Sequence, residues 1–480
     1  MNVIFLLGIL AIAGGPVADQ PPAASAEDLV GALETVMAKA IANAEPSVVA
    51  IHRVKTSGGG ESTLAVRGKR AMRMRDGFVP FGPREMDRLD ADDLISFDFG
   101  SGVVVGGHGE ILTTFHVVKG ASRLIVRAAD RQEFDAEIIA GDPRSDLAVI
   151  APVAIEGVPV PKLKPIALGD PARLRKGSFL LALGNPFNSA RDGKPSASWG
   201  ILSNVARRLD PDVGDLNFPR RALTLPNYPT LLQLDAKLNL GMSGGAVVNL
   251  KGELVGITTS AASPLGFDAM AGYAIPMDKL GRRAVEILKQ GKEIEYGLLG
   301  IRADGHYTNR VGDVQPNSPA SLGQLLVGDV IVKVGDDPIA DFESLILAIN
   351  GYSPGQSVKL KIRRGDDLLE RTVVLAKFPV DGEVIVTNRP AAWRGLRVDY
   401  ASALGMRAVS PLLLDAPPLA VAVIDVEGGS PAAAAGLKKG QLIREVEGKA
   451  VDTPLRFAEA IAGLEGPVKL ETDLGPIVVK

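Results

Sequence analysis

Cysteine is absent from this chain of 480 residues, which excludes disulfide bonds, thiolate metal sites and cysteine nucleophiles. Histidine occurs only four times, which is too few for a histidine-rich metal centre, and we expect neither a metal nor another cofactor. The net charge is −3 and aromatic residues make up 5% of the chain, so no basic, aromatic surface points to nucleic acid as a partner. Beyond its first residues, the chain has no hydrophobic run long enough to span a membrane.

What the chain does have is typical of a globular protein. Hydrophobic residues make up 46% and charged residues 23% of the sequence, and its length allows two to four domains. The 54 glycines and 33 prolines predict many turns and much β structure. A long polar stretch, residues 56–96, and a less regular stretch, residues 210–229, interrupt this pattern and are interpreted as a surface loop and an insertion.

The N-terminus resembles an export signal. Residues 3–13 form an apolar run that is too short for a comfortable membrane span but fits the core of a signal peptide. Ala24-Ser25-Ala26 offers a cleavage site, and Val17-Ala18 is a second candidate. The segment before the apolar run has no Lys or Arg, so the alternative is an uncleaved anchor formed by residues 3–13. Membrane association is expected only in that case.

The stretch with the clearest chemical content is residues 234–257, which contain Ser243 within GMSGG. A serine hydroxyl is a weak nucleophile that needs a nearby base and backbone donors for an oxyanion. Glycine at position 241 allows a tight turn in which the amides of Gly241 and Ser243 point at one oxygen. The alternative interpretation is a glycine-rich hairpin that does no chemistry.

Two other side chains supply what the serine needs. His116 comes directly after a predicted strand in TTFHVV, and Asp146 stands before a predicted buried strand in DPRSDLAVI. An aspartate at the mouth of an apolar strand is costly unless it is paired, so we expect a histidine partner. His52 lies within a predicted strand and is expected to be structural, and His108 lies in a glycine-rich turn.

The order of the three residues is His116, Asp146, Ser243, which is the order of chymotrypsin-type proteases and differs from the subtilisin and α/β-hydrolase orders. With GSGVVV, LALGNPF and GILS in the same sequence, the motifs cover residues 47–289. On these motifs the chain resembles the HtrA/DegP family of exported serine proteases. Met242 stands where that family usually has asparagine, and Thr114-Phe115 replaces the usual pair before the histidine.

The resemblance implies a mainly β fold, with a chymotrypsin-like double β-barrel and the active site in the cleft between the barrels. It implies His116 as general base, Asp146 as its orienting carboxylate and Ser243 as nucleophile, with the Gly241 and Ser243 amides as the oxyanion hole. Periplasmic location, unfolded protein or peptide substrates, and a homotrimer or larger assembly are further implications.

Two later stretches resemble each other, residues 312–349 and 424–461. Each combines a strand, Ser-Pro-Ala, a short helix, a hairpin and an amphipathic helix, and this pattern resembles PDZ domains (α+β). The resemblance implies a peptide groove in each, with the first domain's carboxylate-binding loop formed by Leu298, Leu299, Gly300 and Ile301. Its second-domain counterpart is residues 394–397, and the alternative for either domain is a spacer without a ligand.

The predicted organisation is therefore a signal peptide (1–26), a trypsin-like protease domain (27–290) and two PDZ domains (291–379 and 380–480). The predicted function is an ATP-independent serine endoprotease that degrades misfolded or unfolded exported proteins. The alternative from another class is a proteolytically inactive, peptide-binding chaperone or scaffold.

Overall fold

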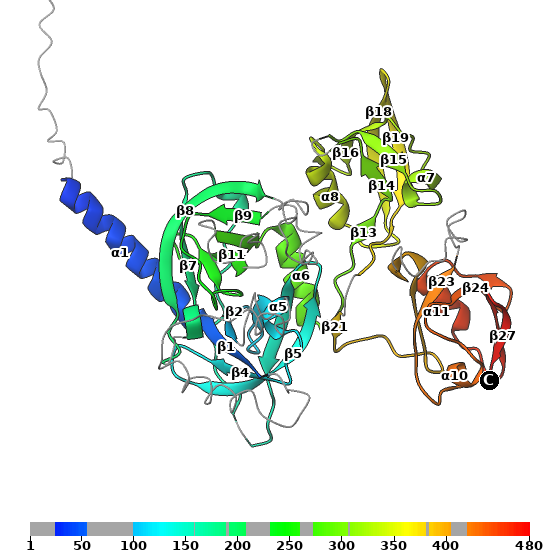
Figure 1. Cartoon of the computed structure of the whole chain (residues 1–480), viewed down its shortest axis with the longest axis horizontal. Helices are drawn as coiled ribbons and strands as arrows, with labels where there is room; N and C mark the ends of the chain where they lie inside the picture. Colours follow the sequence, from blue (N-terminus) through cyan, green and yellow to red (C-terminus); the bar gives the residue numbers. More distant parts are fainter. Residues whose placement is uncertain are drawn as a thin grey trace, which may run out of the picture.

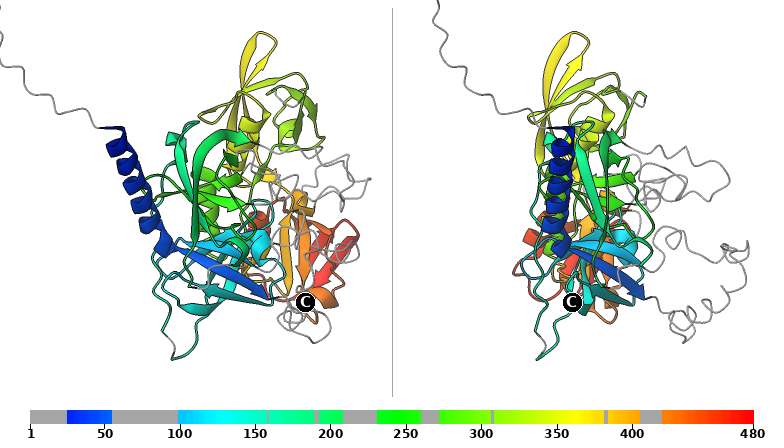
Figure 2. Two further views of the ribbon diagram at one scale, coloured as in Figure 1. Left: turned by 60° about the vertical axis from the view of Figure 1, so that its left-hand side comes forward. Right: turned by 90° about the vertical axis from the view of Figure 1, so that its left-hand side faces the viewer.

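In the computed structural model, the described residues are 25–54, 99–157, 159–188, 192–207, 231–259, 272–305, 308–380, 384–404 and 420–480. The predictions for a signal segment, for the loop at 56–96 and for the insertion at 210–229 lie outside these residues. The first element among the described residues is α1 (Ala26–Ala44), which Ser25 caps by accepting a hydrogen bond from the Asp28 amide. Figure 1 and the left view of Figure 2 show α1 extending away from the β-barrels.

The first barrel is built from the strands between α1 and residue 152. They are β1 (Val48–Val54), β2 (Phe99–Val104), β3 (Ile111–Thr114), β4 (Arg123–Arg127), β5 (Glu133–Asp142) and β6 (Leu147–Pro152), with the short helix α5 (Phe115–Val118) after β3. The strand order is β5-β4-β1-β2-β3-β6, and additional pairing of β5 with β6 closes the ring. Alternation of apolar residues along these strands fills the interior, with Ile51, Leu124 and Ile150 among the buried side chains.

The second barrel closes in the order β10-β11-β12-β9-β8-β7. Its strands are β7 (Phe179–Gly184), β8 (Ser196–Arg207), β9 (Leu231–Leu234), β10 (Ala246–Val248), β11 (Leu254–Thr259) and β12 (Gly272–Pro276), and α6 (Lys279–Lys289) follows. The sequence predicts this helix from Met277 to about Lys289. The structure begins it two residues later, because Asp278 accepts hydrogen bonds from the Leu280 and Gly281 amides and so becomes its N-cap. The two closed barrels confirm the predicted chymotrypsin-like architecture.

The first of the two repeats folds around its own core. Its elements are β13 (Gly297–Leu298), β14 (Ile301–Ala303), β15 (Val311–Val314), α7 (Pro319–Leu322), β16 (Val330–Val334), β17 (Asp337–Pro338), α8 (Phe342–Asn350), β18 (Ser357–Arg364), β19 (Asp367–Val374) and β20 (Ala376–Lys377). Leu345 and Ile349 of α8 pack into this core. The sequence predicts the amphipathic helix of this repeat over residues 342–350, and α8 has the same two ends.

The second repeat has a similar sequence of elements and a separate core. They are β22 (Leu396–Tyr400), β23 (Val421–Val426), α10 (Pro431–Ala434), β24 (Leu442–Val446), β25 (Lys449–Ala450), α11 (Pro454–Ile461), β26 (Val468–Thr472) and β27 (Gly475–Val479). The sequence predicts the amphipathic helix of this repeat over residues 454–464, and α11 ends three residues earlier, at Ile461. In Figure 1 the two repeats lie on the same side of the barrels, the first in yellow and the second in orange and red.

The segment between the repeats returns to the protease barrels. Its strand β21 (Ile385–Val386) pairs antiparallel with β5, in the register Ile385↔Gly141 and Val386↔Ala140. Thr387 also donates a hydrogen bond to the Ile139 carbonyl. The segment between the repeats is therefore hydrogen-bonded to β5, the strand that precedes Asp146.

Candidate active site

His116 and Asp146 meet between the barrels as a buried pair. The Nδ1 atom of His116 lies 2.9 Å and 2.8 Å from the two carboxylate oxygens of Asp146. The His116 backbone amide also donates to Oδ1 of Asp146 at 3.1 Å. Both side chains are almost completely buried. The aspartate that sequence analysis expected to be paired with a histidine is paired with one.

This pairing determines which ring nitrogen can act as a base. A carboxylate accepts hydrogen bonds and has no proton to donate, so Nδ1 of His116 carries the proton. In the neutral ring, Nε2 is then the unprotonated nitrogen. Nε2 is buried and has no hydrogen-bond partner among the described residues. The site thus contains a base with its lone pair available.

The backbone of Asp146 is held in an unusual conformation. Its φ of 53° lies in the left-handed region, which aspartate tolerates better than most residues. The Asp146 carbonyl accepts a hydrogen bond from the Phe115 amide at 2.9 Å, next to the histidine. Thr259, at the end of β11, donates its hydroxyl to Oδ2 of Asp146 at 3.0 Å. Donors from both barrels therefore orient the carboxylate.

Ser243 lies on the turn that precedes β10, and it is buried. Gly244 donates its amide to the Thr258 carbonyl at 2.8 Å, and the neighbouring Thr259 contacts Asp146. This short chain of contacts connects the serine turn to the His116–Asp146 pair. The structure therefore brings the three predicted residues into one region between the barrels.

Residues 239–243, which we name the oxyanion turn, form a tight turn. The Met242 amide donates to the Asn239 carbonyl at 3.1 Å, and Gly241 has a φ of 93°. A positive φ at the third position defines a type II turn, which favours glycine there. The side chain of Met242 is buried and its sulfur accepts a hydrogen bond from the Asn239 amide. Methionine at this position is thus accommodated inside the turn.

Sequence analysis missed the residues that support this site. Ser101 of β2 donates its amide to the Ser243 carbonyl and its hydroxyl to the Gly241 carbonyl, both at 2.8 Å. Arg144, which stands two residues before Asp146 in the sequence, donates a hydrogen bond to the Asp142 carboxylate. Sequence analysis used the GSG sequence around Ser101 only as part of a family motif and assigned Ser101 no role in the site. No residue pattern near it indicated contacts with the second barrel.

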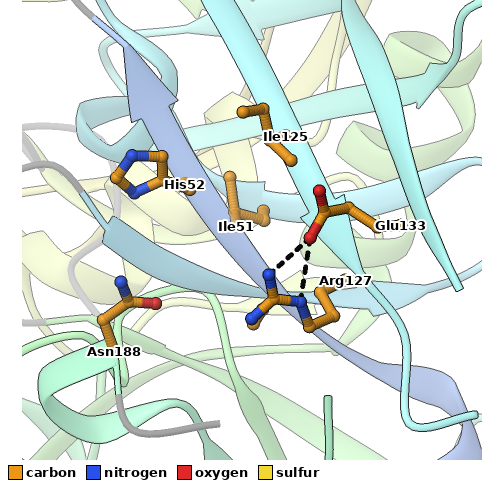
Figure 3. A pocket seen from close by; sticks show the side chains of 7 residues that line it. Ile51, His52, Ile125, Arg127, Glu133 and Asn188 are labelled. Atoms are coloured by element: carbon orange, nitrogen blue, oxygen red, sulfur yellow. Dashed lines mark hydrogen bonds and ion pairs between the residues drawn. The ribbon is translucent and has the colours of Figure 1, made fainter. Parts of the chain in front are cut away.

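A separate cavity of about 230 Å³ lies on the first barrel and contains none of the three predicted residues. Arg127 and Glu133 form an ion pair beside it, as Figure 3 shows. His52 lies in β1 at this cavity. The lining residues are Ala50, Ile51, His52, Ile125, Arg127, Glu133 and Asn188.

The predicted peptide loop of the first repeat spans two strands. Leu298 belongs to β13, which pairs with β20, and Ile301 begins β14, which pairs with β15. Gly300 between them has a φ of 80°, and its carbonyl accepts hydrogen bonds from Gln315 and Ser318. The side chain of Leu299 is buried.

The corresponding loop of the second repeat differs in its hydrogen bonds. Gly395 has a φ of 82°, and a Cβ at this position would clash with Ser430 as a Cβ at Gly300 would clash with Ser318. Here the Leu396 amide donates to the Trp393 carbonyl at 2.8 Å, so an internal acceptor already satisfies it. Arg394 takes the place of Leu299, and its guanidinium donates to the Val479 carbonyl at 2.8 Å.

Within the described ranges, no group of three or more ligating side chains is placed to hold a metal ion. In the same part of the chain, no helix has both the length and the apolar character needed to span a bilayer.

Comparisons with known proteins agree with this geometry. A trypsin-like peptidase domain family matches residues 100–257, and a PDZ domain family matches residues 297–375. The periplasmic pH-dependent serine endoprotease DegQ of Escherichia coli is 30% identical over 409 residues, covering 81% of this chain and 82% of DegQ. A probable periplasmic DegP-like serine endoprotease of Chlamydia trachomatis is 27% identical and covers 95% of this chain and 89% of that protein. The solved structure of the HtrA-type protease AlgW with a tripeptide superposes with a TM-score of 0.51 at 25% identity, covering 72% of this chain and 98% of AlgW.

Proposed function

The chain belongs to the HtrA/DegP family of serine endoproteases, and from that premise we propose that His116, Asp146 and Ser243 are its catalytic triad. The observation that carries the proposal is the buried His116–Asp146 pair, which leaves Nε2 as the unprotonated nitrogen. Ser243, on the glycine-rich turn linked to that pair, is the nucleophile.

Each group has a defined role in the proposed mechanism. Nε2 of His116 accepts the proton of the Ser243 hydroxyl as the oxygen attacks the peptide carbonyl, and then returns it to the departing amine. Asp146 keeps the imidazole in the required tautomer and stabilises its positive charge. The amides of Gly241 and Ser243 stabilise the oxyanion, and water then hydrolyses the acyl-enzyme.

The protein acts in the periplasm, as do the relatives named above. We propose that residues 1–26 are its signal peptide, with the protease domain at 27–290. The proposed substrates are unfolded or misfolded exported proteins, which present the extended segments that a cleft between two barrels can bind. A homotrimer or larger homo-oligomer is the proposed assembly.

The first PDZ domain, at 291–379, is the proposed peptide receptor. Its strand β14 pairs only with β15 among the described strands, so the other edge of β14 can accept a peptide as an added strand. No backbone hydrogen bond among the described residues uses the amides of Leu299 or Gly300, which suits them to hold a terminal carboxylate. In the second PDZ-like domain, at 380–480, Arg394 takes the place of Leu299 and its guanidinium donates hydrogen bonds to the Val479 and Leu464 carbonyls, which favours a structural role there.

The test is cleavage of an unfolded model protein by the full chain, without ATP, beside Ser243→Ala. Cleavage by the wild type alone, with Ser243 labelled by a fluorophosphonate, would support the proposal. An unchanged rate in Ser243→Ala would refute the triad. Absence of cleavage and of labelling in the wild type, with aggregation of the model protein suppressed, would establish the inactive chaperone instead.

A further inference from the structure

Ser101 connects the first barrel to the oxyanion turn of the second. It lies in β2 and is fully buried. Its amide donates to the Ser243 carbonyl at 2.8 Å, and its hydroxyl donates to the Gly241 carbonyl at 2.8 Å. One residue therefore contacts the carbonyl groups of both residues whose amides form the proposed oxyanion hole.

The hydroxyl of Ser101 has its own orientation fixed. The Asn185 amide donates to Oγ of Ser101 at 2.8 Å, so the hydroxyl proton is directed to the Gly241 carbonyl. The Ser101 carbonyl accepts a hydrogen bond from the Thr113 hydroxyl at 2.6 Å, three residues before His116. Ser101 is thereby tied both to the histidine segment and to the serine turn.

The contact acts on the part of the turn that decides the direction of the Gly241 amide. Type I and type II turns differ by rotation of the peptide between their two central residues, here Leu240 and Gly241. That rotation reverses the direction of the Gly241 N–H, so an oxyanion hole exists in only one of the two forms. The next peptide is held on both sides, its carbonyl by Ser101 and its amide by the Asn239 carbonyl.

Loss of the Ser101 hydroxyl would leave the buried Gly241 carbonyl and Asn185 amide without these partners. An unsatisfied buried polar group destabilises the conformation that contains it, and the turn can recover part of this cost by rotating its peptides. Rotation is free of steric penalty at glycine, so Gly241, which favours the observed turn, also permits its alternatives.

We propose that Ser101 is a positioning residue that holds the oxyanion turn in its catalytic conformation. It contacts no reacting atom and acts only through the backbone of residues 241–243. The inference rests on the proposed catalytic role of Ser243. A purely structural role for Ser101 would predict only a loss of folded protein. A positioning role predicts that the rate of the chemical step falls in molecules that remain folded.

The experiment compares full-length Ser101→Ala with Ser47→Ala. Ser47 is an equally buried serine whose hydroxyl has no hydrogen-bond partner among the described residues, so it provides the matched control. Turnover of a peptide substrate is measured, and kcat is expressed per site titrated with a fluorophosphonate. Loss of one oxyanion donor costs about 10²–10³ in kcat, and a turn that is only partly displaced should lose less.

We expect Ser101→Ala to lower kcat per titrated site by about 10- to 100-fold with KM within about threefold of wild type. Ser47→Ala should keep the wild-type kcat. If Ser101→Ala does not yield folded protein, Ser101→Cys replaces it, because a thiol at the same place is a weaker donor, and its kcat should fall by at least about threefold.

A kcat per titrated site in Ser101→Ala within threefold of wild type would overturn the inference, as would an equal loss in Ser47→Ala. For Ser101→Cys, an unchanged kcat would do the same. These failures are distinct from failure of the proposed function, in which the wild type itself would show neither turnover nor labelling at Ser243.

Discussion

Arg144 donates a hydrogen bond of 2.5 Å to the backbone carbonyl of Ile294, in the segment that joins the protease domain to the first PDZ domain. The same guanidinium binds Asp142 at 2.8 Å and the Phe378 carbonyl at 3.3 Å. Arg144 precedes Asp146 by two residues. The loop that carries the proposed catalytic aspartate is therefore attached to the segments entering and leaving the first PDZ domain.

Replacement of Arg144 should destabilise the protein strongly. Burial alone would lower the pKa of this guanidinium, but the charge of Asp142 outweighs it and raises the pKa, so Arg144 remains a cation. Arg144→Met would leave Asp142 buried without its counter-ion, at a cost of about 3–5 kcal/mol in the free energy of unfolding. Urea denaturation measures this.

The matched control is Arg123→Met. Arg123 also pairs with an aspartate at 2.8 Å, but its side chain is 58% exposed, so the expected loss is about 0–1 kcal/mol. Equal destabilisation by the two variants would show that burial does not strengthen the Arg144 contact.

Thr259 should affect the rate rather than the fold. Its hydroxyl is one of the donors to Asp146, and Thr259→Val keeps the shape while removing that donor. A hydrogen bond to a charged group contributes about 1.5–3 kcal/mol, so we expect kcat to fall by about tenfold or more with KM little changed. Steady-state kinetics on a peptide substrate would test this, and an unchanged kcat would show that the His116 contacts orient Asp146 by themselves.

The predicted peptide loop offers a clean pair of glycine variants. A Cβ on Gly300 would lie 2.2 Å from the Ser318 Cβ, whereas a Cβ on Gly365, which also has a positive φ, would meet nothing within 4 Å. Gly300→Ala should therefore abolish binding of a fluorescent peptide with an aliphatic, free C-terminus, while Gly365→Ala should bind it normally. Fluorescence anisotropy measures both, with the amidated peptide as a second control. Wild-type affinity in Gly300→Ala would place the peptide site elsewhere.

The first PDZ domain should also lose stability in acid. Burial alone would raise the pKa of Asp329, but the hydrogen bonds from Arg364 outweigh it and lower the pKa below 3.8. A depressed pKa stabilises the fold above the unfolded-state value, and this contribution is lost as the pH falls through the folded-state pKa. Urea unfolding of the whole protein can be monitored by hydrogen-exchange mass spectrometry in peptides from residues 311–375. The free energy of unfolding of this region should decline below about pH 4. Asp329→Asn should have lower stability at neutral pH and a weaker decline, and parallel curves would contradict the assignment.

The three residues of the proposed triad could be singled out from the sequence because each lies in a local motif at a strand end or turn. His116 and Asp146 also have a physical reason to meet, since a buried carboxylate requires a partner. Arg144 could not be found in this way, because two of its acceptors are backbone carbonyls that lie 150 and 234 positions along the chain, and hydrogen bonds between distant residues leave no periodic pattern in the sequence. The strand β21 was missed for a similar reason, since two residues are too few to show alternation. Long-range polar contacts are thus where sequence patterns carry least information.

Lys377 joins three parts of the chain and provides the sharpest test of how the domains are held. Its buried ammonium lies 2.6 Å from Asp399 in the second PDZ-like domain and 3.1 Å from Glu293 after the protease domain. Burial alone would lower the pKa of Lys377, but Asp399 and the nearby glutamates raise it, so the lysine stays charged. Lys377→Met would leave these carboxylates to repel one another across the junction.

We expect Lys377→Met to release the second PDZ-like domain from the rest of the chain, because the attraction at the junction becomes repulsion. Small-angle X-ray scattering should then show a larger radius of gyration, which high salt would partly reverse by screening the carboxylates. The control is Lys469→Met, which removes a lysine that is 58% exposed and pairs with Glu471 inside one sheet. Identical scattering from the two variants would mean that backbone contacts such as β21 with β5 suffice to hold the domains together, and that the lysine contributes little to their arrangement.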